Sequence, residues 1–264
     1  MKNINISHEL FTNFNDITYY DEPHKYFLGD QQLISVTTLI HKYQKDFDED
    51  YWAQYKADQY NITSDEVKRI WRFLNKKGTM KGSIIHDYIE NILLNKVFKY
   101  PKDEIIRTFG FDPILKEYEI TKKHADDFYT DIQGKLIPIK TELVVYDKET
   151  LVSGMLDILF YNVKAKEYQI WDNKTNKKLS YDNNWDKLLG GLSDLDDCDI
   201  EIYSLQLELY KRLIEKNTSI KLGKSYLSWF SHNNPTYKII ETKDRSKQID
   251  MILNERINKL KLVA

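Results

Sequence analysis

The pattern of polar and apolar positions divides the first half of the chain into a hairpin and a series of helices. Residues 17–40, ITYYDEPHKYFLGDQQLISVTTLI, predict a β-hairpin that turns at Gly29-Asp30 and is followed by a short helix beginning at Ser35 or Thr37. Aromatic and aliphatic residues then recur at roughly helical spacing over residues 48–77. The run Ser64-Asp65-Glu66 marks a helix start, because acidic side chains favour the positive end of the helix dipole. Further helices are expected over residues 83–95, the clearest amphipathic segment, and 114–129.

The second half of the chain begins with an alternating pattern that is typical of strands. Three successive strands are expected over residues 136–147, 151–162 and 166–174. Residues 176–200 are polar and indicate a long loop, or a short helix with a loop. A helix over 201–216, a strand over 224–231 and an amphipathic helix from about residue 244 complete the order. Helices followed by a central meander and a closing helix and strand predict an α/β or α+β domain.

Composition narrows the class of protein. The 264 residues are 41% hydrophobic, which is enough for a sizeable core, and no Gly/Pro-rich linker divides them, so we expect one domain. The net charge of −2 argues against a protein that coats nucleic acid, although a local basic groove remains compatible with it. One cysteine, Cys198, excludes an intrachain disulfide and a cysteine-rich zinc site. The sequence shows neither a signal peptide nor an apolar run of membrane-spanning length, so we expect a soluble cytoplasmic protein.

The best-patterned hairpin carries charges where apolar residues are expected. Asp157 lies in its first strand, and Asp172 and Lys174 project to one face of the second, next to Ile170 and Trp171. One interpretation is a buried ion pair that leaves one acid uncompensated, at a cost of several kcal/mol. The other is a site for Mg²⁺ or Mn²⁺ held by two carboxylates, with the lysine facing a substrate anion or a water molecule. Such a set suits the hydrolysis of a phosphodiester.

Four motifs extend this second interpretation to a family. GMLDILF and YQIWDNKT match the G-x-x-D and D-x-K strands of the PD-(D/E)XK nuclease superfamily, GSIIHDYIE resembles the G-x-x-x-H motif of its RecB-like exonuclease branch, and YSLQLELY resembles its Q-x-x-x-Y motif. The motifs occur in the family's order over roughly residues 78–212. The segments LLGGLSDLDDCD and DEPHKYFLGDQQLISVTTL are similar to phage-encoded members. The resemblance implies a restriction-endonuclease-like α/β core with a mixed central sheet flanked by helices and a helical N-terminal elaboration.

The resemblance also implies roles for individual residues. Metal ligands would be His86, Asp157, Asp172 and the main-chain carbonyl of Asn173. Lys174 would orient or activate water and stabilise the phosphorane-like transition state, while Gln206 and Tyr210 would border the catalytic site and position DNA. The metal would be Mg²⁺ or Mn²⁺. The Asp in the D-x-K motif, where many members of the superfamily have Glu, is compatible with the RecB-like branch.

Six further residues are candidates with a functional and a structural interpretation each. Glu142 is an acid in an apolar strand near a position that is acidic in many family members, and Glu90 could pair with the His86 imidazole or be a solvated acid. Lys177 and Lys178 could bind a phosphate backbone or occupy a solvated turn. Tyr181 and Trp185 could stack on unpaired bases or cover the edge of the core.

The sequence therefore predicts a single nuclease domain over 1–264. It divides into an N-terminal hairpin and helical elaboration (1–80) that arches over the site, a catalytic core (81–235) and a C-terminal helix (236–264). The expected activity is that of a metal-dependent deoxyribonuclease. An exonuclease acting on a DNA strand end, possibly single-stranded, in phage recombination, replication or processing is favoured, which would place it in the host cytoplasm. A structure-specific endonuclease and a non-cleaving nucleic-acid-binding module remain alternatives.

Overall fold

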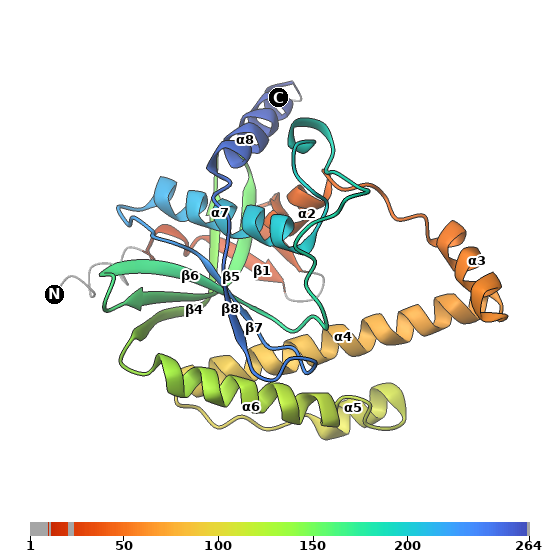
Figure 1. The fold of residues 1–264 in the computed structure, drawn as a ribbon. Helices are drawn as coiled ribbons and strands as arrows, with labels where there is room; N and C mark the ends of the chain where they lie inside the picture. The colour runs from red at the N-terminus through yellow and green to blue at the C-terminus, as the bar shows by residue number, and fades with distance from the viewer. Residues whose placement is uncertain (1–9, 11, 21–23, 263–264) are drawn as a thin grey trace.

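The protein has three layers, with a mixed β-sheet between two groups of helices (Figure 1). A computed structural model describes residues 10, 12–20 and 24–262. One helical layer contains α2 (Val36–His41), α7 (Asp199–Asn217) and α8 (Ser246–Lys261), and the other contains α4 (Ser64–Leu93), α5 (Lys102–Phe109) and α6 (Leu115–Ile132). The predicted class, an α/β fold with a mixed sheet flanked by helices, is confirmed.

The sheet brings both halves of the chain together. Its strands are β1 (Ile17–Tyr20), β2 (Lys25–Leu28), β3 (Gln31–Ser35), β4 (Leu136–Asp147), β5 (Val152–Asn162), β6 (Glu167–Lys174), β7 (Tyr226–Trp229) and β8 (Lys238–Glu241). They lie in the order β1-β2-β3-β5-β6-β7-β8, and β4 pairs with β5 off this path. The pairs β3–β5 and β6–β7 are parallel and the others are antiparallel. The N-terminal hairpin is therefore an extension of the central sheet.

One edge of β5 is shared between two strands. Its beginning pairs with β3 through Val152 and Ser153, and its end pairs with β6 from Ile158 to Asn162. Among the described strands, none forms a ladder with residues 154–157 on this edge. The sheet therefore opens beside Asp157.

Two hydrophobic clusters fill the spaces on either side of the sheet. Leu156 and Leu159 of β5 belong to the cluster under α7 and α8, whereas Ile158 and Phe160 belong to the cluster under α4 and α6. Side chains of a regular strand alternate between faces, so Leu156 and Ile158 would share one. The alternation is broken at Asp157, which marks a local irregularity of the kind that re-aims side chains next to active sites.

Helix α4 connects the core to a projecting arm. It has 30 residues and a length of about 45 Å. Thr63 and Glu66 form a capping box at its start, the place that the acidic run indicates. Its second half packs on the sheet through residues such as Ile85 and Ile89, which are fully buried, and each contributes roughly 1.5–3 kcal/mol.

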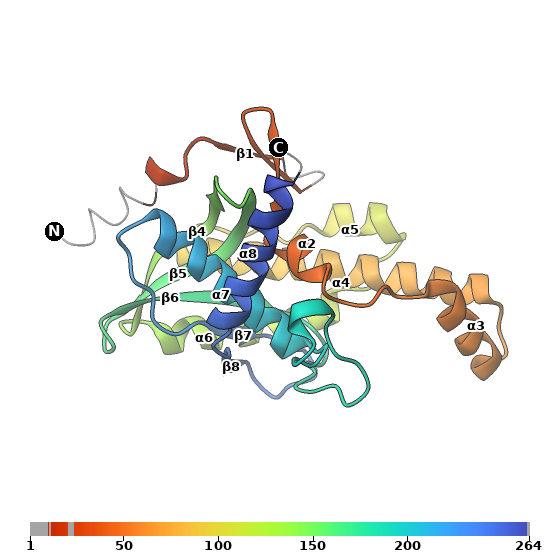
Figure 2. The same cartoon turned by 90° about the horizontal axis from the view of Figure 1, so that it is seen from above.

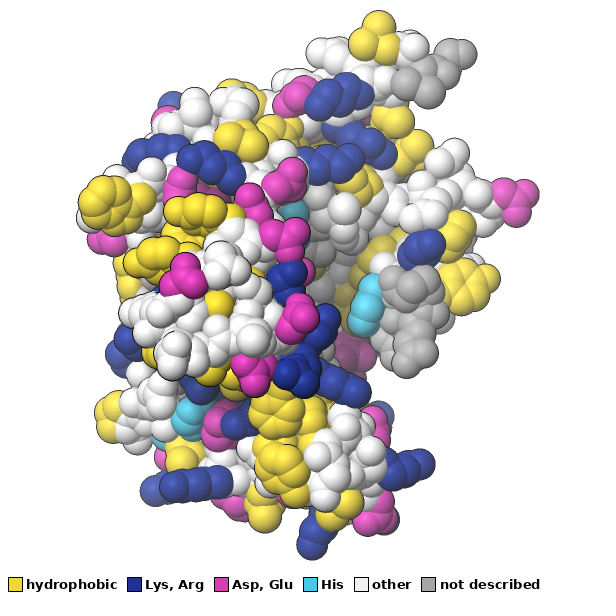
Figure 3. Space-filling view, turned by 90° about the vertical axis from the view of Figure 1, so that its right-hand side faces the viewer, with side chains coloured by type: hydrophobic (Ala, Val, Ile, Leu, Met, Phe, Trp, Pro, Cys, Tyr) yellow, Lys and Arg dark blue, Asp and Glu magenta, His cyan; other side chains and the backbone are white. Residues whose placement is uncertain are grey.

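The first half of α4 pairs with α3 (Glu49–Tyr60) and extends away from the body in both views (Figures 1 and 2). The expectation that the N-terminal helices arch over the site is wrong for this conformation. Several aromatic side chains of the arm, including Tyr51, Tyr55 and Phe73, are exposed. Figure 3, which views the molecule from the side of the arm, shows hydrophobic, basic and acidic side chains interspersed on this face.

Most predicted elements are present, and the departures have physical reasons. The hairpin of β2 and β3, the start of α2 after its cap Ser35, and the strands β4, β5 and β6 are as expected. The loop before α7 contains only a short 3-10 helix, η1 (Gly190–Leu192). Residues 78–82, which lie between the expected helical segments 48–77 and 83–95 and contain two glycines, continue α4 without a break. Packing of this helix on the sheet outweighs the cost of about 1 kcal/mol for each glycine. The sequence pattern did not indicate α5 or β8.

Substitution of Gly154 is expected to destabilise the protein. A Cβ atom at this position in β5 would lie 2.5 Å from Cε1 of Tyr210 and 3.1 Å from Cγ2 of Val36. We expect Gly154→Ala to lower the free energy of unfolding by roughly 1–3 kcal/mol, because both neighbours are held in a packed core. Urea unfolding followed by circular dichroism measures this.

Gly78→Ala is the matched control. A Cβ atom at Gly78 meets no atom within 4 Å, and the residue lies inside α4, so this change is expected to stabilise the protein by about 0.5–1 kcal/mol. Equal effects of the two substitutions on the free energy of unfolding would show that the packing around Gly154 leaves room for a Cβ atom beside Tyr210.

Candidate active site at the opening between β5 and β6

The site forms where β6 separates from β5. The last paired residues are Ile158 and Trp171. Beyond them, the main-chain N–H of Asn173 donates to Oδ2 of Asp157 at 2.7 Å. A carboxylate therefore takes the place of a strand partner, and this fixes Asp157 beside the Asn173 peptide. The Asp157 side chain keeps 19% of its surface exposed, so the carboxylate remains open to solvent.

His86 of α4 lies against the same two residues. Its Nε2 is 2.9 Å from the main-chain oxygen of Asn173, and its Nδ1 is 3.3 Å from Oδ2 of Asp157. The imidazole is 31% exposed. The G-x-x-x-H segment and the two charged strands thus meet, although His86 and Asn173 are 87 residues apart in the chain. A Cβ atom at Gly82, one turn before His86, would lie 3.5 Å from Oγ1 of Thr175, an ordinary van der Waals contact, so the helix runs beside the end of β6 here.

Asp172 and Lys174 form an ion pair on the other side of β6. The distance from Nζ of Lys174 to Oδ2 of Asp172 is 2.5 Å, and their side chains are 16% and 4% exposed, respectively. Burial raises the pKa of Asp172 to about 6, against the attraction of Lys174, and the charge of Asp157 contributes to the rise. Burial lowers the pKa of Lys174, but Asp172 and Asp157 more than offset this, so it is raised overall. The ion-pair interpretation therefore describes Lys174 and Asp172, and Asp157 is the acid that this pair leaves uncompensated.

Glu142 and Glu90 line a small hollow with His86 and Asp157. The pairs Thr141–Ile158 and Leu143–Leu156 place Glu142 opposite Asp157. Glu142 has a φ of +46°, a conformation that costs a non-glycine residue on the order of 1–3 kcal/mol and that concentrates at functional sites. Partial burial in the hollow raises the pKa of Glu142, and the negative charges of Glu90, Asp87 and Asp157 raise it further.

Glu90 bonds to a strand residue. Its Oε1 accepts a hydrogen bond of 2.7 Å from the Thr141 hydroxyl. This contact ties α4 to β4 next to Glu142. Neither of the two interpretations of Glu90, a partner of the imidazole or a solvated acid, describes this bond. Thr141 gave no signal of its own in the sequence.

Helix α7 closes the side of the site that carries Lys174. Nε2 of Gln206 donates to the Tyr210 hydroxyl at 3.3 Å, and both side chains are buried. Burial raises the pKa of Tyr210, with Asp172 adding to the effect, so the phenol stays protonated. Tyr203, one turn before Gln206, places its ring centroid 4.3 Å from the Lys174 ammonium. Tyr203 was not among the residues predicted from the sequence, although its spacing from Gln206 puts both on one helix face.

The four residues proposed from sequence to bind DNA lie outside this cluster. Lys177, Lys178, Tyr181 and Trp185 are exposed in the segment after β6. Trp185 is 92% exposed, so it does not cover the core edge. Cys198, in contrast, is buried next to α7, and burial raises the pKa of its thiol, as expected for a packed residue.

The donor groups at the opening fit a divalent cation with few protein ligands. Among the described residues, no three side chains of histidine, cysteine, aspartate or glutamate gather closely enough to bind a metal by themselves. The convergent donors are instead one carboxylate (Asp157), one imidazole (His86) and one main-chain carbonyl (Asn173), with Asp172 nearby but paired to Lys174. The carboxylate and the carbonyl suit Mg²⁺ or Mn²⁺, and Mg²⁺ is bound through one or two carboxylates and keeps several waters, whereas the imidazole is a ligand that later transition metals favour.

Two solved structures share a weak likeness with this chain. No family model and no curated protein matches the chain. Among solved structures it is similar to a "Putative exonuclease" from Eubacterium rectale, at 11% identity and a TM-score of 0.35, over 69% of this chain and 66% of that one. It is also similar to SSO0001, at 11% identity and a TM-score of 0.27, over 68% of this chain and 86% of that one. The match thus spans just under two thirds of the exonuclease chain. At these identities and TM-scores, neither structure indicates the activity of this protein.

The described part of the chain contains no helix that could span a membrane. None of its helices combines the length and the apolar character needed to cross a bilayer.

Proposed function

We propose that the protein is a metal-dependent deoxyribonuclease of the PD-(D/E)XK superfamily, RecB-like branch, and acts as an exonuclease on DNA strand ends. One observation carries the proposal. The imidazole of His86, the carboxylate of Asp157 and the carbonyl of Asn173 converge at a solvent-exposed opening of the sheet, beside the buried pair of Asp172 and Lys174. This convergence joins three of the four sequence motifs in space, and Gln206 and Tyr210 of the fourth pack behind them.

His86, Asp157 and the Asn173 carbonyl would hold Mg²⁺ or Mn²⁺, and Asp172 would join them when its bond to Lys174 loosens. When bound, the cation would polarise the scissile phosphoryl group and neutralise its developing charge. The acidic surroundings favour a cation here, since Glu142 and Asp172 both have raised pKa values caused in part by Asp157.

Lys174 would act on the phosphate from the opposite side. Its ammonium is held between Asp172 and the ring of Tyr203, and 16% of the side chain remains exposed. In this position it would stabilise the charge that develops on the phosphoryl oxygens and orient the attacking water. Phage recombination, replication or DNA processing is the setting that we propose for this activity.

Incubation of the purified protein with DNA tests the proposal. We expect loss of end-labelled linear DNA in Mg²⁺ or Mn²⁺ and none in EDTA, with closed circular DNA left intact. Cleavage of circles would instead show an endonuclease. Retention on a DNA column without metal-dependent loss of any substrate would show a non-cleaving binding module and would refute the hydrolytic proposal.

A further inference from the structure

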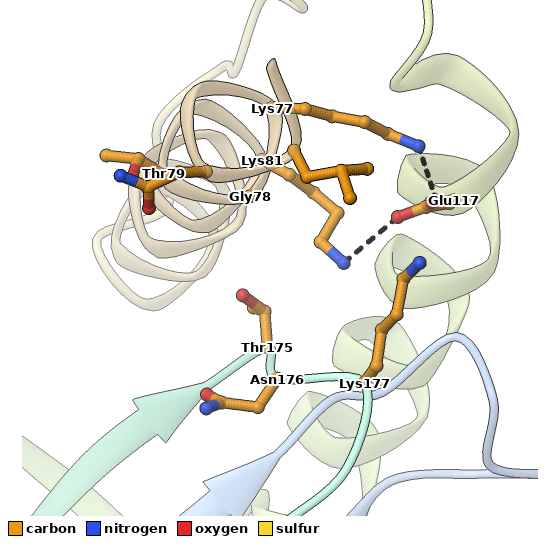
Figure 4. Close-up of a pocket in the computed structure, with 10 residues that line it drawn as sticks. Lys77, Gly78, Thr79, Lys81, Glu117, Thr175, Asn176 and Lys177 are labelled. Carbon is orange, nitrogen blue, oxygen red and sulfur yellow. Dashed lines mark hydrogen bonds and ion pairs between the residues drawn. The ribbon is translucent and has the colours of Figure 1, made fainter. Parts of the chain in front are cut away.

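A pocket lined with lysines lies beside the candidate active site, between α4, α6 and the end of β6 (Figure 4). Lys77 and Lys81 enter it from α4 and Glu117 from α6, and the segment that follows β6 adds Thr175, Asn176 and Lys177. Figure 4 shows the ends of the three lysine side chains turned toward one space around Glu117. None of the four sequence motifs accounts for this cluster.

The pocket holds an excess of positive charge. Glu117 accepts from Lys77 at 2.6 Å and from Lys81 at 3.1 Å. One carboxylate among three ammonium groups leaves two positive charges uncompensated, and neighbouring His232, 3.3 Å from Nζ of Lys81, brings no negative charge. Lys81 is only 4% exposed. Burial lowers its pKa, and repulsion by Lys77 and Lys177 contributes. Cations crowded in this way are stabilised by an anion that all of them can reach.

The location of the pocket fits the path of a nucleic-acid strand. Lys81 precedes His86 by five residues, which is about 7.5 Å along the axis of α4. Thr175 and Lys177 follow Lys174 directly at the end of β6. A Cβ atom at Gly82, between Lys81 and His86, would lie 3.5 Å from Oγ1 of Thr175, so α4 and the end of β6 adjoin at the pocket. A phosphate next to one held at His86 and Lys174 would therefore lie near it. The hydroxyl of Thr175 can donate a hydrogen bond there in addition to the charge of the lysines.

We propose that this pocket binds a phosphate group of the substrate strand, next to the one that is hydrolysed. The inference rests on the proposed nuclease function and extends it to the recognition of the substrate. The phosphate has two sources, an internal phosphodiester with one negative charge or a terminal phosphate with a charge of about −1.5 to −2. The pocket recognises what the two share, namely anionic oxygens within reach of Lys77, Lys81 and Lys177.

Lys177 and its neighbour Lys178 offer a matched test. Both are exposed lysines in one segment, but only Lys177 lines the pocket. We expect Lys177→Gln to weaken binding of a short single-stranded oligonucleotide about 5- to 10-fold at low salt, and to reduce the slope of log K against log salt by about 0.7. Lys178→Gln removes the same charge one residue away and is expected to weaken binding about 2-fold or less. Fluorescence anisotropy in EDTA measures the affinity without hydrolysis.

Three versions of the oligonucleotide distinguish the sources of the phosphate: one with hydroxyl groups at both ends, one with a 5′-phosphate and one with a 3′-phosphate. If Lys177→Gln weakens the binding of only one of the two phosphorylated oligonucleotides, the pocket binds a terminal phosphate. If it weakens the binding of all three equally, the pocket binds an internal phosphate. If Lys177→Gln and Lys178→Gln weaken binding equally while the wild type still hydrolyses DNA, the phosphate-binding role of the pocket is refuted and the nuclease proposal is not. A wild type that neither binds the oligonucleotides nor hydrolyses DNA would overturn the nuclease proposal as well.

Discussion

We expect Asp157→Asn to reduce metal-dependent hydrolysis of DNA by about 10³-fold or more while leaving the fold intact. The change removes the carboxylate that contacts both His86 and the Asn173 peptide at the opening of the sheet. The asparagine side chain is isosteric, and its carbonyl oxygen can still accept the hydrogen bond from the Asn173 N–H. Rates on end-labelled linear DNA in Mg²⁺ and in Mn²⁺, together with a thermal melt, measure the two effects separately.

Asp127→Asn is the control for this experiment. Asp127 is an exposed aspartate of α6, and its substitution makes the same chemical change outside the site. We expect wild-type rates and an unchanged melting temperature. Wild-type activity in Asp157→Asn would show that this carboxylate is not required, and the assignment of the opening as the catalytic site would then be wrong.

Lys174→Met is expected to lower the rate of hydrolysis by about 10²- to 10⁴-fold and to preserve the binding of Mn²⁺. The substitution removes the ammonium but none of the proposed metal ligands. Breaking a buried ion pair costs about 3–5 kcal/mol when the remaining charge stays ionised. The loss of stability should be smaller here, because burial and the charge of Asp157 raise the pKa of Asp172 and the attraction of Lys174 that opposes this rise is removed, so the carboxyl can take up a proton. Activity assays, calorimetric titration with Mn²⁺ and urea unfolding give the three quantities.

The double variant Asp172→Asn/Lys174→Met separates the structural role of the lysine from its catalytic one. It removes both charges of the pair that are 2.5 Å apart, so we expect it to regain most of the stability that Lys174→Met loses. It should remain inactive. A double variant that hydrolyses DNA at the wild-type rate would mean that Lys174 serves only to neutralise Asp172.

The spacing of residues indicated most elements of this protein and the residues at the centre of the candidate site. Alternation over β4, β5 and β6 identified the strands, and the two acids and the lysine stood out because charges interrupt buried strands. The acidic run after Thr63 indicated the start of α4. These elements can be predicted from the sequence because strand period, helix period and capping depend only on residues close together in the chain.

Only the tertiary structure decided which of these residues contact one another. Asp157 meets His86 because β6 leaves β5 at this point and α4 packs across the gap, and the same separation directs Asp172 to Lys174 instead. The left-handed conformation of Glu142, the contact of Tyr203 with Lys174 and the gathering of lysines around Glu117 follow from the same packing. Contacts between segments distant in the chain depend on how whole elements pack against one another, which no local spacing encodes.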